Sequence, residues 1–264
     1  MVDPTVVSQY LAAFDRLVRE TFEPSAPRRT RSTRITTRPL PGINFILDLE
    51  HEVTQHLARL GDHPALGAMT NTAMARRLIQ EAFLQEYLVT CRFIDTIAPL
   101  LSKRFPDPLR ESVHRYFAEE IGHETFEREN CLRLGLTPQH IDDARPLLLH
   151  LAFVDILTVL ARESPISFFC ASMFTEGLIG SHDSLVSLAL QALPNESELV
   201  RGISEHAELN EEIDHRGVGR DWMSRVLIVD ETVQHEVSEM LAYLAELNWR
   251  MWQQLVRFVT AGTS

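Results

Sequence analysis

The chain contains 264 residues, of which 25 are basic and 37 are acidic, so its formal net charge is −12. This length suffices for one large domain or two small ones with a substantial hydrophobic core. Hydrophobic residues make up 45 % of the chain and charged residues 23 %, which excludes disordered, collagen-like and low-complexity proteins. The acidic balance repels phosphate groups and anionic lipids, so we expect neither nucleic acid nor a membrane surface as a partner.

The sequence carries few signals that indicate cellular location. The N-terminus lacks a basic segment followed by an apolar one, so no signal peptide is predicted. The longest apolar run, 147–161, is shorter than the roughly 20 residues that span a bilayer and predicts a buried helix. Cys91, Cys131 and Cys170 show no C-x-x-C spacing, which argues against a disulfide framework and against a thiolate metal site. We therefore expect a cytoplasmic protein.

The first part of the chain differs from the rest. A helical segment, 6–22, leads into a stretch rich in Pro, Ser and Thr that carries five arginines between 28 and 38. Residues 1–42 are interpreted as an N-terminal helix and a basic arm, which either folds against an acidic surface or binds an anion. Residues 43–264 are predicted to form a single helical domain.

After Gly42 the hydrophobic pattern is helical almost throughout. Stop and start signals are conventional, with Gly135 and Pro138 ending one segment and Pro108 opening another. The fold class is therefore all-α. The last segment is amphipathic and should close the bundle or pack against a second subunit. The expected helices are 43–60, 71–101, 107–135, 138–144, 146–161, 166–192, 196–227 and 231–260.

Two similar five-residue sequences carry metal-binding residue types. EEIGH at 119–123 contains Glu120 and His123, and EEIDH at 211–215 contains Glu212 and His215. Residues three apart lie on one face of a helix, so each sequence can direct a carboxylate and an imidazole at one point. One such pair alone is a weak signal, because Glu and His fall at this spacing by chance on many solvated helices.

The position of the acidic residues strengthens the signal. Glu120 lies on the apolar face of its segment, and Glu86 and Glu176 share this misplacement on theirs. A bare carboxylate is costly to bury. Glutamates from two helices and a Glu-x-x-His from each of two others form the ligand set that binds a pair of iron or manganese ions inside helical bundles. The charges of two divalent ions would balance those of four carboxylates.

Several nearby residues leave alternatives open. Glu211 or Glu212 could be the ligand, and Glu208 on the same face could supply a further oxygen. Glu119, Glu124 and Glu127 are expected to face solvent or to accept hydrogen bonds behind the ligands. The remaining histidines show no second convergent pattern and are interpreted as surface or satisfied core residues.

The sequences EEIGHETFERENCLRLGL, SMFTEG around Glu176 and ELNEEIDH, with the Trp-containing last helix, resemble the haem-oxygenase-like diiron oxidases and oxygenases over about 71–260. The resemblance implies a bundle of about seven helices with a diiron site in its core. The family's last ligand helix reads His-x-x-x-Asp-x-x-His, whereas this chain has Glu208 and Glu212 in the first two places. This last ligand sequence is also similar to that of ferritin-like arylamine N-oxygenases, so a ferritin-like four-helix bundle is the alternative fold. The implied metal ligands are Glu86, Glu120, His123, Glu176, Glu208, Glu212 and His215.

What the resemblance implies is an enzyme that activates O2 at two Fe(II) ions, with manganese as an alternative metal. Glu120 would be a bridging carboxylate, with Glu176 or Glu212 as the second. The implied reaction is N-oxygenation or oxidative cleavage of an amine or amino acid in natural-product biosynthesis. Oxidative decarboxylation or desaturation of a fatty acid or another carboxylate is the alternative. The resemblance leaves an external electron donor open and suggests a homodimer.

Three other classes of protein compete with the oxidase interpretation. An iron-storage bundle would use the same ligands but would assemble into a cage. A small-molecule-binding relative of the same fold would lack the metal. A helical interaction module would have no reason to place Glu86, Glu120 and Glu176 on apolar faces.

Overall fold

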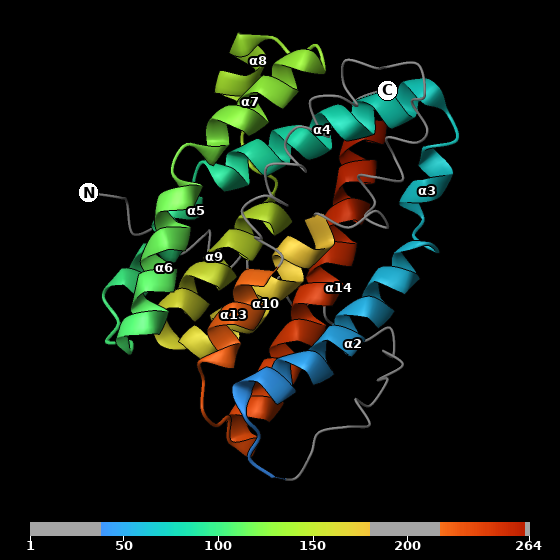
Figure 1. Ribbon diagram of the computed structural model, residues 1–264. Coiled ribbons are helices and arrows are strands. Elements are labelled where there is room, and N and C mark those ends of the chain that lie inside the picture. Colours follow the sequence, from blue (N-terminus) through green and yellow to red (C-terminus); the bar gives the residue numbers. More distant parts are fainter. Residues whose placement is uncertain (1–37, 180–216, 262–264) are drawn as a thin grey trace, which may run out of the picture. The chain divides into compact units, whose positions relative to one another are not determined.

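The computed structural model describes residues 38–179 and 217–261, all within one compact unit, Arg34–Ser264. These residues form helices joined by short connections (Figure 1). Their bounds are α2 Gly42–Leu60, α3 Ala65–Ala68, α4 Thr72–Thr90, α5 Phe93–Leu101, α6 Asp107–Glu120, α7 His123–Arg133, α8 Pro138–Asp143, α9 Leu148–Glu163, α10 Pro165–Ile179, α13 Val218–Ser224 and α14 Glu231–Ala261. The prediction of an all-α fold is confirmed.

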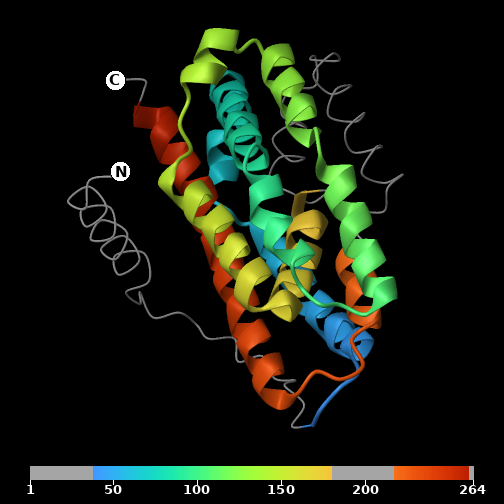
Figure 2. The same cartoon turned by 90° about the vertical axis from the view of Figure 1, so that its left-hand side faces the viewer.

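Helix α14 is the longest of the described helices and packs against several of the others. It contacts α2, α3, α4, α9 and α10, and it is seen beside α2 in Figure 1 and beside α9 in Figure 2. Its apolar residues recur at helical spacing, which buries Val237, Leu241, Leu244 and Leu255 on one stripe. The predicted closing helix at 231–260 is confirmed, and α14 closes the bundle by packing against helices of its own chain.

Two segments that the sequence predicts as single helices are each divided. The segment 71–101 separates into α4 and α5 at Cys91 and Arg92. The segment 107–135 separates into α6 and α7, because Ile121 is extended and Gly122 adopts a left-handed conformation with φ of 94°. L-residues with a side chain rarely adopt this conformation, so glycine is what permits the break. The continuous helix expected across 107–135 is therefore wrong at its centre.

Close backbone contact fixes the short helix α13 against α10. A Cβ atom at Gly219 would lie 2.6 Å from the carbonyl oxygen of Phe169 and 2.9 Å from the backbone nitrogen of Met173. Only glycine fits at such a distance. Trp222, one turn further along α13, is fully buried as a result of this approach.

A histidine joins the first part of the bundle to the last. The Nδ1 atom of His63 accepts a hydrogen bond from the backbone N–H of Ala65 at 2.9 Å, and Nε2 donates to the carbonyl oxygen of Trp249 at 3.0 Å. His63 is thus the satisfied core residue that the sequence suggested. Within the described ranges, every helix is too short or too polar to cross a lipid bilayer.

Candidate metal centre

The break between α6 and α7 places Glu120 and His123 on its two sides. Glu120 is the last residue of α6 and His123 the first of α7. His123 Nδ1 lies 2.7 Å from Glu120 Oε2, and both side chains are buried. The two residues therefore meet as the Glu-x-x-His spacing predicted, but across a turn rather than along one helix face.

The electrostatics of the pair reflect this contact. Burial works to lower the pKa of His123, but the hydrogen bond and the charge of Glu120 outweigh it, so the pKa lies above its ordinary value. A raised imidazole pKa favours the charged form beside the carboxylate. The ion pair offsets part of the cost of burying Glu120.

Tyr116 brings a second carboxylate to the same place. Its hydroxyl donates a hydrogen bond to Glu176 Oε1 at 3.0 Å, which links α6 to α10. Burial, the charges of Glu176 and Glu120, and hydrogen bonding to both carboxylates raise the pKa of Tyr116 well above its ordinary value. The phenol thus stays protonated as a donor between two carboxylates from different helices. No local sequence pattern predicts this role of Tyr116.

Glu127 is buried next to His123. It is 1 % exposed and occupies the helical turn that follows His123, which agrees with the predicted alternative of a position behind the ligands rather than with the alternative that it faces solvent. Its charge adds to those that raise the pKa of His123. The sequence carried a signal for this position, because Glu127 and the buried Cys131 are four residues apart on α7 and share a face.

Glu86 approaches from α4, which packs against α7. The side chain is half-buried, as expected for a carboxylate on an apolar face. Burial raises the pKa of Cys131 to about 12, and the charges of Glu127 and Glu86 add to this rise. The charges of Glu86 and Glu127 therefore both act on the buried thiol of α7.

The remaining predicted ligands, Glu208, Glu212 and His215, lie outside the described residues, as does the alternative Glu211. Within 38–179 and 217–261, no group of three or more His, Cys, Asp or Glu side chains is arranged to hold a metal ion. The donor types that do come together are carboxylate and imidazole, which suit iron and manganese rather than a structural zinc. In donor chemistry, the residues fit part of a carboxylate-bridged metal centre.

Comparison with solved structures bears on the fold. The chain is similar to the crystal structure of a domain of unknown function with a heme oxygenase-like fold from Shewanella denitrificans, with a TM-score of 0.60 and 16 % identity. The match covers 83 % of this chain and 95 % of that one. The chain adopts a haem-oxygenase-like fold. No protein-family profile and no curated protein matches the sequence.

This fold agrees with the first of the two resemblances drawn from the sequence rather than with the ferritin-like alternative. It gives no substrate, because folds of this kind carry different functions. In this haem-oxygenase-like bundle, the described candidate residues come from α4, α6, α7 and α10, so four separate helices supply them.

Proposed function

We propose that this protein is a non-haem diiron oxidase or oxygenase that uses O2 to oxidise a small molecule. The observation that carries the proposal is that the carboxylates of Glu120 and Glu176 both interact with the buried hydroxyl of Tyr116, while Glu120 also pairs with His123. The haem-oxygenase-like fold is compatible with this function.

The energetics favour a cationic occupant. Burying carboxylates without compensation costs several kcal/mol each, so natural proteins pair them or let them bind metal. Glu120 and Glu127 are both nearly inaccessible, and Glu86 adds a third negative charge beside α7. Two divalent ions would balance the carboxylates.

The protein's own residues define how such a centre would be held. Glu86, Glu120, His123 and Glu176 would be ligands from the described helices, joined by Glu212, His215 and Glu208. Tyr116 would orient Glu176 by donating to Oε1. When bound, iron would supply the redox chemistry that O2 activation needs. The buried side chains of α6 and α7 would exclude water from the reacting groups.

The substrate that we propose is an amine or amino acid, which is oxidised at nitrogen or cleaved. This choice is an analogy with the enzymes that the sequence resembles. A cytoplasmic homodimer served by an external electron donor, in a natural-product pathway, completes the proposal. This choice of substrate does not depend on the geometry around Tyr116. If the substrate were a different small molecule, the proposed metal centre would stay the same.

The test is an anaerobic titration of metal-free protein with Fe(II), followed by exposure to O2. We expect saturable uptake of about two ferrous ions per chain and a transient visible absorption on mixing with O2. Glu120→Gln should abolish most of the uptake. The matched control is Glu111→Gln, since Glu111 is an exposed glutamate on the same helix. Absence of saturable uptake by the unaltered protein would refute the proposal.

A further inference from the structure

Trp222 packs against Tyr116 of the candidate metal centre. The indole is fully buried, and its ring centroid is 5.1 Å from that of Tyr116 with the two planes at 90°. Edge-to-face packing at this distance is a direct aromatic contact. Because the hydroxyl of Tyr116 bonds to Glu176, the two rings connect α13 to a candidate ligand carboxylate.

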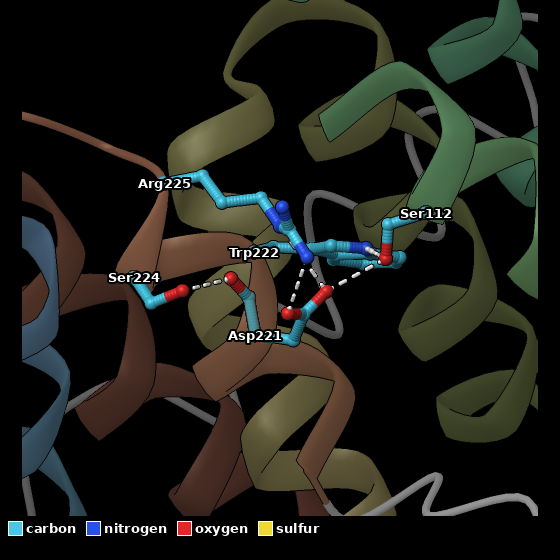
Figure 3. Close-up of polar contacts among 5 residues, drawn as sticks. All are labelled: Ser112, Asp221, Trp222, Ser224 and Arg225. Carbon is cyan, nitrogen blue, oxygen red and sulfur yellow. Dashed lines mark hydrogen bonds and ion pairs between the residues drawn. The ribbon is translucent and has the colours of Figure 1, made fainter. Parts of the chain in front are cut away.

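A chain of hydrogen bonds begins at the indole nitrogen (Figure 3). The Nε1–H group of Trp222 donates to Ser112 Oγ at 3.1 Å, and the Ser112 hydroxyl donates to Asp221 Oδ2 at 2.7 Å. Ser112 and Tyr116 are four residues apart on α6 and share a face, which explains why both reach Trp222.

The chain ends on an ionised group at the surface. Arg225 Nη2 donates to Asp221 Oδ1 at 2.8 Å. Burial works to raise the pKa of Asp221, but hydrogen bonds from Arg225 and Ser112 outweigh it and hold the pKa below its ordinary value. The Asp221 side chain is 38 % exposed and that of Arg225 is 35 % exposed, so solvent reaches this end.

We propose that Trp222 relays single electrons between the surface and the candidate metal centre, and that its indole proton moves through Ser112 to Asp221. The oxidant in this step rests on the proposed function. It is the one-electron oxidant that reduction of O2 at the metal centre would supply. The path of the electron and of the proton follows from the contacts among the described residues. Tryptophan and tyrosine are the side chains whose rings give up an electron most readily, and electron tunnelling favours rings in contact.

The step balances in atoms and electrons. Trp222 gives one electron to the oxidant by way of Tyr116. The indole N–H bond breaks, its proton passes to Ser112 Oγ, and the hydroxyl proton of Ser112 passes to Asp221 Oδ2. The products are a neutral indolyl radical and a protonated Asp221. A one-electron reductant of the thiol or ascorbate class, arriving at the exposed end, restores the indole as Asp221 returns the proton.

The hydrogen bonds continue beyond the one acceptor that the indole itself needs. A buried indole N–H needs one acceptor, and the serine oxygen alone satisfies it. The ionised carboxylate behind the serine, held by an arginine at the surface, gives the proton a destination. Ser112, Asp221 and Arg225 therefore do more than fill the hydrogen-bonding capacity of Trp222.

The first experiment uses full-length, metal-free protein in which Trp249→Phe and Trp252→Phe leave Trp222 as the one tryptophan, since the chain has three. A photogenerated ruthenium tris(bipyridine) oxidant supplies single-electron oxidation, and transient absorption distinguishes the neutral indolyl radical from its radical cation. We expect the neutral radical. Asp221→Asn and Ser112→Ala should shift the signal to the cation, and Ser112→Thr should restore the neutral form.

The matched control is Asp107→Asn, which alters an exposed Asp–Arg pair on α6 and should leave the radical unchanged. Circular dichroism checks that each variant folds. Failure to form a radical on Trp222, or the same neutral radical in Asp221→Asn, would overturn the proposal. Because no metal is involved, this result is independent of the iron titration. In iron-loaded protein, exposure to O2 and rapid freezing should give a tryptophan radical signal that Trp222→Phe abolishes.

Discussion

Helix α14 and the pair α6–α7 differ in how their sequences relate to their shapes. Helix α14 continues for 31 residues and buries an apolar stripe. The α6–α7 segment breaks at Ile121 and Gly122, and around this break it buries Glu120, His123 and Glu127. Regular helix persists where apolar residues need only one face. It is interrupted where charged side chains from consecutive turns must converge.

The largest expected effect lies in the apolar region. Leu244→Ala removes a fully buried side chain of α14 and should lower the free energy of unfolding by about 2–5 kcal/mol, since the cavity adds to the lost burial. Urea denaturation measures this change. Because Leu244 lies in the apolar region, we expect the folded variant to bind the same number of iron ions. A loss of iron uptake would show that α14 and the α6–α7 pair are not independent.

Two buried histidines sharpen the contrast, because one is paired with a carboxylate and the other is not. Burial lowers the pKa of His150 on α9 from 6.5 to about 4, whereas the pKa of His123 is raised. Between these pH values the unfolded chain binds more protons at His150 than the native chain does. Acidification from pH 6.5 to pH 4 should therefore destabilise the protein by on the order of 2–3 kcal/mol through this residue.

The measurement for His150 is the free energy of unfolding in urea at a series of pH values. His150→Leu should flatten the dependence over this range, while His114→Gln, a change at an exposed histidine of α6, should not. An unchanged slope in His150→Leu would contradict the expectation.

In the polar region, Tyr116→Phe removes the hydrogen bond to Glu176 and keeps the ring. We expect Fe(II) affinity to fall about 10–100-fold, the usual effect of losing a group that orients a ligand. Isothermal titration under anaerobic conditions measures it. Tyr87→Phe, on α4, is the matched control and should bind iron as the unaltered protein does.

The smallest expected effect concerns the break itself. Gly122→Ala meets no atom within 4 Å, so the cost is the left-handed backbone alone, about 1 kcal/mol. Gly122→Asn should cost less, because asparagine tolerates this conformation. Gly67→Ala, also free of contacts but inside α3, should be neutral or stabilising. Thermal unfolding compares the three, and equal losses at both glycines would contradict this account.

The predictability of the fold follows the same division. Helix α14 could be read from the sequence because one apolar stripe determines both its extent and its buried face. The break in α6–α7 was missed because Glu120 and His123 fit a continuous helix equally well. Gly122 was the available signal, since glycine within a helical pattern marks a point where the helix can end.

The candidate site was predictable in composition and only partly in arrangement. Misplaced carboxylates on apolar faces identified Glu86, Glu120 and Glu176 as buried or half-buried, and the structure agrees. The bond from Tyr116 to Glu176 joins residues 60 positions apart, so it depends on how α6 and α10 pack rather than on any local pattern. For Glu127 the local signal was its spacing of four residues from the buried Cys131 on α7.

The length of α14 constrains how this chain can change over time. At 1.5 Å per residue its 31 residues extend about 46 Å, and they contact α2, α3, α4, α9 and α10. Inserting one residue near its middle would rotate everything beyond that point by about 100°, turning Leu255 and Val259 away from the core while Val237 and Leu241 stayed in place. Substitutions in α14 can therefore be accommodated one at a time, whereas insertions and deletions should be confined to the connections between helices.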